Sequence, residues 1–244
     1  MSNTKKKVKV IAHRGFSGKF PENTVVAFKE AAKLGVDGIE MDVKITKDGT
    51  LVILHDESVD RTTDGTGKIQ ELTIEQVKDL DAGSWFSPAF KGTTIPTFEE
   101  ALDSIPDNIE LNLHLLPNPV ITRNVIITLK ERKRINNSYL AIHASQIQLA
   151  REMCKEIRIC NMRTQTNPVE YIEETHRLKC PILQFFTPSY EVTKELIDKA
   201  HSYGIFVNVF FADTENEMKK LIENGADAIL TNRPDILIRI LKEK

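Results

Sequence analysis

The sequence predicts a (β/α)8 barrel with a small insertion after its second strand. Short apolar segments alternate with amphipathic helical patterns along nearly all of the 244 residues. When one arm of an expected hairpin is set aside, eight strands remain in βα alternation, which is the number a closed barrel needs. Polar side chains also gather where the first strands end. We expect residues 8–244 to form a single domain.

The expected strands are short and rich in apolar residues, and they are Val8–Ala12, Ile39–Val43, Ile109–Leu113, Tyr139–His143, Ile157–Asn161, Ile182–Phe186, Phe206–Phe210 and Ala228–Thr231. The expected helices are Glu22–Leu34, Asn118–Lys133, Ser145–Lys155, Pro168–Leu178, Ser189–Tyr203, Thr214–Asn224 and Asp235–Lys244. Asn23 or Thr24 would cap the first helix and Gly35 would end it. An open doubly wound sheet is the alternative, but no G-x-G-x-x-G follows the first strand.

A β-hairpin is expected at the end of the second strand, because Asp48-Gly49 is a strong turn signal between two apolar arms. If these two residues alone join the arms, Asp42 lies opposite His55 and Glu40 shares that face. Two carboxylates and one imidazole then converge. The alternative is a polar hairpin face that is simply solvated.

Residues 56–97 interrupt the alternation and are expected to form the insertion. They contain one helical pattern, Ile74–Leu80, and the aromatic side chains of Trp85, Phe86 and Phe90. Because the segment leaves from His55, it could cap a site at the barrel mouth. A role in folding alone is the alternative.

The composition is typical of a soluble globular protein, with 41% hydrophobic and 28% charged residues. The net charge of −2 gives no support for a nucleic-acid partner, and no apolar run is long enough for membrane insertion. Cys154, Cys160 and Cys180 follow no C-x-x-C pattern, which predicts reduced thiols and a cytoplasmic location. The expected partner is therefore a small-molecule substrate, and the sequence carries no signal for an oligomeric state.

Three side chains at the ends of the second and third strands have the composition of a divalent-metal site. Glu40 and Asp42 would come from the second strand and His114 from the third. This set predicts one divalent metal ion, without distinguishing Mg²⁺, Ca²⁺, Mn²⁺ or Zn²⁺. A salt bridge from the two carboxylates to Arg14 is the alternative.

His13 and His55 are then available for proton transfer, since the pKa of histidine lies near neutrality. Arg14 offers a planar fork suited to a phosphate. A metal, an acid, a base and an arginine together predict cleavage of a phosphate ester. Phe210 could wall the substrate site or simply pack in the barrel. Ordinary structural roles are expected for the remaining histidines, His143, His176 and His201, although His143 ends the fourth strand and could border the pocket.

Several motifs, in this order, resemble the glycerophosphodiester phosphodiesterase family. They are His13-Arg14-Gly15, Pro21-Glu22-Asn23-Thr24, Gly38-Ile39-Glu40-Met41-Asp42-Val43, His55-Asp56, Asp81-Ala82-Gly83-Ser84-Trp85-Phe86, Ile95-Pro96-Thr97-Phe98-Glu99-Glu100 and residues 225–234. The resemblance implies a (β/α)8 barrel that hydrolyses glycerophosphodiesters to an alcohol and sn-glycerol 3-phosphate. It places the acid/base histidines on His13 and His55, the metal-binding carboxylates on Glu40 and Asp42, the phosphate-binding arginine on Arg14, and a supporting residue of the substrate cluster on Glu22.

The third strand departs from the family pattern. A Glu-x-Lys is usual there, with a metal-binding glutamate and a phosphate-binding lysine, whereas this chain has His114-Leu115-Leu116. A histidine ligand favours softer ions such as Mn²⁺ or Zn²⁺, and Leu116 cannot replace a lysine. The seventh strand has Phe210-Phe211-Ala212-Asp213 where the family tends to have Trp-Thr-Val-Asn, and the fourth has His143-Ala144 where Ser-Phe is usual.

Three functions are consistent with these residues. The main hypothesis is metal-dependent hydrolysis of glycerophosphodiesters by acid–base catalysis with two histidines. A catalytically impaired protein that binds a phosphate ligand on the same fold is one alternative, because of His114 and Leu116. A lysophospholipase D-like enzyme is the other, with Phe210, Phe211 and the insertion aromatics as candidates for an apolar groove.

Overall fold

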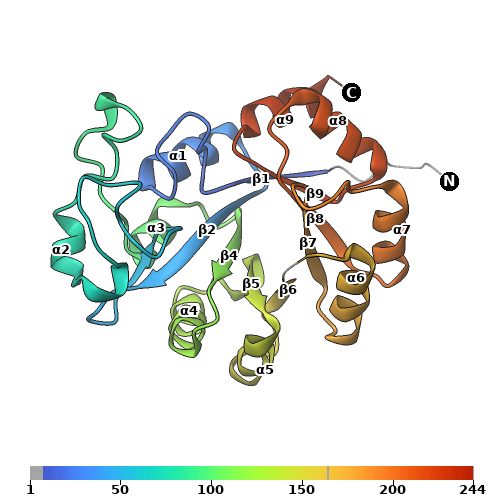
Figure 1. The fold of residues 1–244 in the computed structure, drawn as a ribbon, viewed down its shortest axis with the longest axis horizontal. Coiled ribbons are helices and arrows are strands. Elements are labelled where there is room, and N and C mark those ends of the chain that lie inside the picture. The colour runs from blue at the N-terminus through green and yellow to red at the C-terminus, as the bar shows by residue number, and fades with distance from the viewer. Residues whose placement is uncertain (1–7, 164, 244) are drawn as a thin grey trace.

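The computed structural model describes residues 8–163 and 165–243, and it confirms the (β/α)8 barrel. Figure 1 shows the strands at the centre with helices around them, and the insertion to one side beyond α1 and β2. Eight strands run parallel and close through the pairing of β1 with both β9 and β2. They are β1 (Lys9–Ala12), β2 (Gly38–Ile45), β4 (Glu110–Leu115), β5 (Ser138–His143), β6 (Arg158–Met162), β7 (Ile182–Phe186), β8 (Phe206–Phe210) and β9 (Ala228–Thr231).

The helices that alternate with these strands are α1 (Val25–Leu34), α3 (Phe98–Ser104), α4 (Pro119–Glu131), α5 (Ala144–Met153), α6 (Pro168–Arg177), α7 (Lys194–Ser202), α8 (Glu215–Asn224) and α9 (Pro234–Lys242). A 3-10 turn, η3 (Ile135–Asn137), precedes β5. Among the described residues, no helix is both long enough and apolar enough to cross a membrane. The predicted helix that begins at residue 189 is too long, because α7 begins only at Lys194.

Local capping explains the ends of α1 and the presence of α3. The Thr24 side chain accepts a hydrogen bond from Ala27 N, and Gly35 ends α1 in the left-handed conformation. The predicted cap at Thr24 and the predicted stop are therefore confirmed, but the helix begins at Val25 and not at Glu22. The sequence pattern did not predict α3. Its signal is a capping box in which Thr97 and Glu100 bond each other's backbone N–H groups.

The predicted register of the hairpin is wrong by one residue. β3 (Leu51–Ile53) pairs antiparallel with β2 so that Val43 faces Ile53, and the N–H of Leu54 donates to the Asp42 carbonyl at 3.0 Å. Leu54, and not His55, therefore lies opposite Asp42. His55 is one residue further along, just past the end of the strand.

The turn itself causes this shift, because it contains three residues and not two. Thr46 N donates to Thr50 O at 3.0 Å, and Gly49 N donates to Thr46 O at 3.1 Å. Gly49 is left-handed (φ 88°), whereas a two-residue type I′ turn would require a positive φ at Asp48 as well. The Thr46 hydroxyl stabilises the longer turn by accepting from Thr50 N and donating to Asp48 Oδ1.

The insertion between β3 and α3 holds η1 (Ile69–Glu71), α2 (Ile74–Lys78) and η2 (Pro88–Phe90). The insertion has a small apolar core that is separate from the main core and includes the second arm of the hairpin. Its buried residues are Val52, Leu54, Val59, Ile69, Val77, Ala82 and Ile95. The insertion therefore packs against the same end of the barrel as Asp42 and His55.

The interior of the barrel is closed below its mouth by a layer of buried amide side chains. Asn112 on β4 and Asn208 on β8 both donate to Gln184 Oε1 on β7, at 3.2 and 2.9 Å. The Asn208 amide also lies 3.3 Å from the hydroxyl of Tyr139. This layer of amide side chains fills the interior of the barrel, so a ligand has access only from the C-terminal ends of the strands.

Gly15 provides a test of how β1 is joined to α1. Gly15 has φ +79°, and a Cβ there would lie 2.7 Å from the Ala27 backbone, whereas Gly35 has the same φ and open space around it. We expect Gly35→Ala to lower the free energy of unfolding by about 1 kcal/mol. Gly15→Ala should cost at least about 2 kcal/mol, because it adds a backbone clash to the same strain. Urea unfolding of both variants measures this, and equal losses would contradict the close approach.

Candidate active site

Glu40, Asp42 and His114 lie together at the mouth of the barrel. One ligand atom from each lies within 4.8 Å of the other two. The parallel register of β2 and β4 causes this, since it sets Asp42 directly beside His114, and Glu40 is two residues back on the same face. Asp42 and His114 also face each other through Oδ1 and Nδ1 at 3.0 Å. The three predicted metal ligands are thus brought together.

Two carboxylates are buried side by side in this cluster, with only 3% of Glu40 and of Asp42 exposed. Burial and the neighbouring charge of Asp42 raise the pKa of Glu40 well above its usual range. Burial opposes the ionisation of Asp42 as well, but the hydrogen bond and charge of His114, with help from Arg14, hold its pKa well below its usual range. Two crowded carboxylates and an imidazole are a donor set that fits a divalent cation.

A left-handed backbone conformation after β1 brings Arg14 into contact with both carboxylates. Arg14 has φ 54°, which points its backbone N–H at Glu40 Oε2 at 3.0 Å. Its guanidinium lies 3.3 Å from Asp42 Oδ2 and donates to Glu22 Oε1 at 2.7 Å. Asn23, also left-handed, donates from Nδ2 to Asp42 Oδ2 at 2.9 Å. The salt bridge to Arg14 that was the alternative is thus formed by Asp42 but not by Glu40, and it coexists with the ligand cluster.

His13 is buried beside this turn, and its tautomer is fixed by a chain of hydrogen bonds. Asn232 donates from Nδ2 to Asp213 Oδ2 at 2.6 Å, which leaves Asn232 Oδ1 facing His13 Nδ1 at 2.7 Å. Because an amide oxygen only accepts, the His13 proton sits on Nδ1 and the lone pair on Nε2. Nε2 lies 3.8 Å from Glu40 Oε2. Burial and the adjacent charge of Arg14 lower the pKa of His13 to about 4.

His55 reaches the same mouth from the end of β3, with 40% of its side chain exposed. Its Nδ1 faces Asp56 Oδ1 at 2.6 Å. Hydrogen bonds from Arg61 lower the pKa of Asp56 to about 2, so this partner is a carboxylate. His55 also contributes to the low pKa of Asp42. His55 and Asp42 therefore still line the same hollow despite the shift in hairpin register.

Arg61, a residue that the sequence reasoning missed, connects the two halves of the site. It comes from the insertion and donates to Asp56 Oδ2 at 2.6 Å and to Glu22 Oε1 at 2.7 Å. Glu22 in turn accepts from Arg14, so both of its oxygens are engaged. Burial would raise the pKa of Glu22, but Arg61 and Arg14 together lower it. Asn23, Asn232 and Asp213 were also missed as contributors; their contacts span 19 to 219 residues of sequence.

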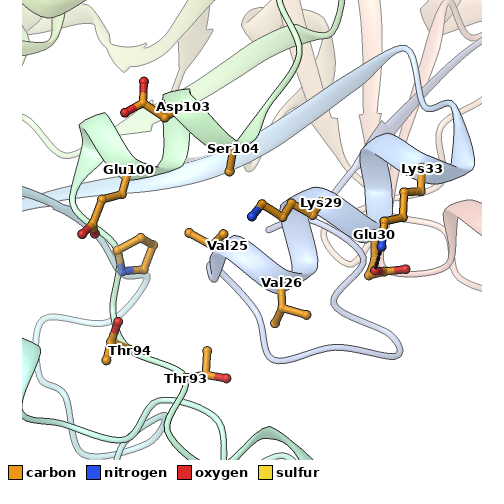
Figure 2. Close-up of a pocket in the computed structure, with 11 residues that line it drawn as sticks. Val25, Val26, Lys29, Glu30, Lys33, Thr93, Thr94, Glu100, Asp103 and Ser104 are labelled. Atoms are coloured by element: carbon orange, nitrogen blue, oxygen red, sulfur yellow. Dashed lines mark hydrogen bonds and ion pairs between the residues drawn. The ribbon is translucent and has the colours of Figure 1, made fainter.

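A hollow of about 410 Å³ opens beside the cluster, and its lining residues are Asp42, Lys44, His55, Asp56, Glu57, His114 and Leu116. Burial lowers the pKa of Lys44, and the carboxylates of Asp42, Glu57 and Asp56 oppose that shift. A larger hollow of about 590 Å³ lies outside the barrel, where Val25 and Lys29 of α1 face Ser104 of α3 (Figure 2). The smaller hollow is the relevant one, because the predicted chemical groups line it.

Phe210 and the remaining histidines make packing contacts or local hydrogen bonds. The Phe210 ring packs on His13, with centroids 4.7 Å apart, and on Phe186 and Phe211. It therefore borders the mouth and packs at the same time. The remaining histidines have structural contacts: His143 accepts from Ser145 N at the start of α5, His176 stacks on Tyr203, and His201 faces Asp227.

The fold and this cluster define a (β/α)8-barrel protein with a polar candidate active site at the C-terminal mouth. A sequence model of the glycerophosphoryl diester phosphodiesterase family matches residues 13–236. The chain belongs to this family, as the motifs predicted.

Individual relatives agree over nearly the full length. The chain is 36% identical to a glycerophosphodiester phosphodiesterase of Caldanaerobacter subterraneus subsp. tengcongensis, covering 97% of this chain and 99% of the relative. It is 32% identical to one of Bacillus altitudinis, covering 96% and 98%. A solved structure of an Oleispira antarctica phosphodiesterase in complex with the product sn-glycerol-3-phosphate has a TM-score of 0.87 and 28% identity, covering 98% of each chain.

The Glu22 carboxylate gives a pH-dependent test of the network. Its folded pKa lies below the ordinary value of 4.5, so its contribution to stability is complete above that value and is lost as the pH falls through the folded pKa. We expect Glu22→Gln to lower the free energy of unfolding by about 1–3 kcal/mol at pH 7 and by clearly less at pH 3.5. Urea unfolding at both pH values measures this difference.

Glu223→Gln is the matched control, because Glu223 is exposed on α8. It should change stability by less than about 0.5 kcal/mol at either pH. A Glu22→Gln loss that stayed constant between the two pH values would show that the charge of Glu22 does not hold Arg14 and Arg61.

Proposed function

We propose that this protein hydrolyses glycerophosphodiesters to an alcohol and sn-glycerol 3-phosphate in a metal-dependent reaction. The observation that carries the proposal is the cluster of Glu40, Asp42 and His114 ligand atoms within 4.8 Å, with His13 and His55 beside it. Membership of the glycerophosphoryl diester phosphodiesterase family supports the reaction class. The neighbour solved with sn-glycerol-3-phosphate supports the choice of product.

Glu40, Asp42 and His114 would hold one divalent ion. Two carboxylates and an imidazole favour Mn²⁺ or Zn²⁺ over Ca²⁺ and Mg²⁺. When bound, the ion supplies Lewis-acid stabilisation of the charge that develops on the phosphate. Arg14 lies against the same carboxylates and would hold a phosphate oxygen. Glu22 would act on the substrate through Arg14, because both of its oxygens bond to arginines.

The hydrogen bonds assign different roles to the two histidines. Nδ1 of His13 holds its proton toward Asn232, so Nε2 presents a lone pair to the cluster. We assign His13 as the general base that takes a proton from the attacking hydroxyl, of water or of the substrate's own glycerol. His55 faces the Asp56 carboxylate, which would stabilise an imidazolium. We assign His55 as the general acid that protonates the leaving alcohol.

A metal panel tests the proposed function. After chelation, release of sn-glycerol 3-phosphate from glycerophosphocholine should fall about a hundredfold or more, because the loss of Lewis-acid stabilisation costs several kcal/mol. Mn²⁺ or Zn²⁺, added one at a time, should restore it better than Ca²⁺, and Asp42→Asn should not be restored by any ion. Turnover that survives chelation would contradict the proposal. Ligand binding without turnover under every ion would favour the phosphate-binding alternative, and activity confined to lysophospholipids would favour the lysophospholipase D-like one.

The two histidine roles can be separated by the basicity of the leaving group. A glycerol 3-phosphate ester of p-nitrophenol has an acidic leaving group that needs no protonation. We expect His55→Ala to lose about 10²–10⁴-fold in kcat with glycerophosphocholine and at most about tenfold with the nitrophenyl ester. His13→Ala should lose about the same factor with both substrates. The reverse pattern would exchange the roles, and full activity in His13→Ala would remove both assignments.

A further inference from the structure

The hollow beside the cluster is lined by a lysine that has no hydrogen-bond or ion-pair partner among the residues that the structure describes. Lys44 lies on β2 two residues after Asp42, lines the hollow, and is only 6% exposed. Across residues 8–163 and 165–243, its ammonium makes no hydrogen bond and no ion pair within 4.0 Å. The stem of Lys44 is largely buried, but its ammonium is not among the buried polar atoms and so faces the hollow, where it is available to a ligand.

The other cations near this mouth are already engaged. Arg14 is held by Glu22 and lies against Asp42. Arg61 makes four hydrogen bonds to Glu22 and Asp56. Lys44 therefore differs from both arginines, because its charge is not satisfied by a neighbouring carboxylate at bonding distance.

Strand register places Lys44 beside the residue at which a basic side chain is missing. β2 and β4 pair Asp42 with His114 and Val43 with Leu115, so the next positions along the two strands are Lys44 and Leu116. Side chains alternate along a strand, so these two face the same side as Asp42 and His114, and both line the hollow. Lys44 on β2 and Leu116, the first residue after β4, thus line the same hollow.

We propose that Lys44 binds a phosphate oxygen of the substrate and is a further catalytic residue of this site. The assignment rests on the proposed function, since it takes the phosphodiester to lie over Glu40, Asp42 and His114. An ammonium is a point-charge partner for a phosphate oxygen and would share the phosphate with Arg14. A basic side chain from β2 would compensate for the apolar Leu116 that follows β4.

The test compares Lys44→Met and Lys44→Arg with a matched control, Lys47→Met, in the exposed turn of the same hairpin. We expect Lys44→Met to lower kcat/KM about ten- to a hundredfold, because a hydrogen bond to a charged group is lost. The Kd for sn-glycerol 3-phosphate, measured by calorimetry, should rise in the same variant. Lys44→Arg should recover part of the activity, and Lys47→Met should match the wild type.

Stability separates this role from a structural one. Lys44→Met keeps the apolar stem and removes an ammonium that bonds to no described residue, so its urea midpoint should equal or exceed that of the wild type while activity falls. A lower midpoint with unchanged kcat/KM and product affinity would overturn the proposal. If the wild type itself releases no sn-glycerol 3-phosphate under any ion, the proposed function fails first, and the Kd comparison with sn-glycerol 3-phosphate still decides for or against Lys44.

Two substrates locate the oxygen that Lys44 contacts. Glycerophosphocholine offers anionic oxygens only on its phosphate, whereas glycerophosphoserine adds a carboxylate on the leaving group. Similar losses for both in Lys44→Met support the phosphate contact. A loss confined to glycerophosphoserine would overturn it and place Lys44 at the leaving group.

Discussion

The structure of this mouth depends on keeping two carboxylates, Glu40 and Asp42, buried next to each other. Their mutual repulsion and desolvation must be offset, and every nearby element contributes to that. The turn after β1 adopts a left-handed conformation at Arg14, which brings a backbone N–H and a guanidinium to the pair. Asn23 and His114 add hydrogen bonds to Asp42 from α1's entry and from β4. A divalent cation completes the compensation in the function that we propose.

The two histidines beside this pair have different hydrogen-bond partners, and this difference is the basis of the different roles that we propose for them. His13 is buried against an amide oxygen, so its proton lies on Nδ1 and its lone pair points toward the cluster. His55 is half-exposed against a carboxylate, at the open side where a leaving alcohol can depart. The insertion contributes Arg61, which bonds both the Asp56 carboxylate and Glu22 and so connects the partner of His55 to the partner of Arg14.

Much of this could be predicted from the sequence, because it depends on short-range periodicity. Alternating apolar patterns gave the eight strands, and parallel strands bring their C-terminal ends together, which placed Glu40, Asp42 and His114 at one mouth. The hairpin register could not be predicted, because the Thr46 hydroxyl selects a three-residue turn that the Asp-Gly pair alone does not specify. Arg61 and Asn232 were missed for another reason: they meet Glu22 and His13 across 39 and 219 residues, and no local pattern encodes such contacts.

The most direct test of this account is a crystal structure of the protein soaked with Mn²⁺, with data collected at the manganese absorption edge. The account predicts one strong anomalous peak at the mouth, within about 2.0–2.3 Å of oxygens from Glu40 and Asp42 and of one ring nitrogen of His114. A peak that lacks His114, a peak elsewhere on the barrel, or no peak at saturating Mn²⁺ would contradict it.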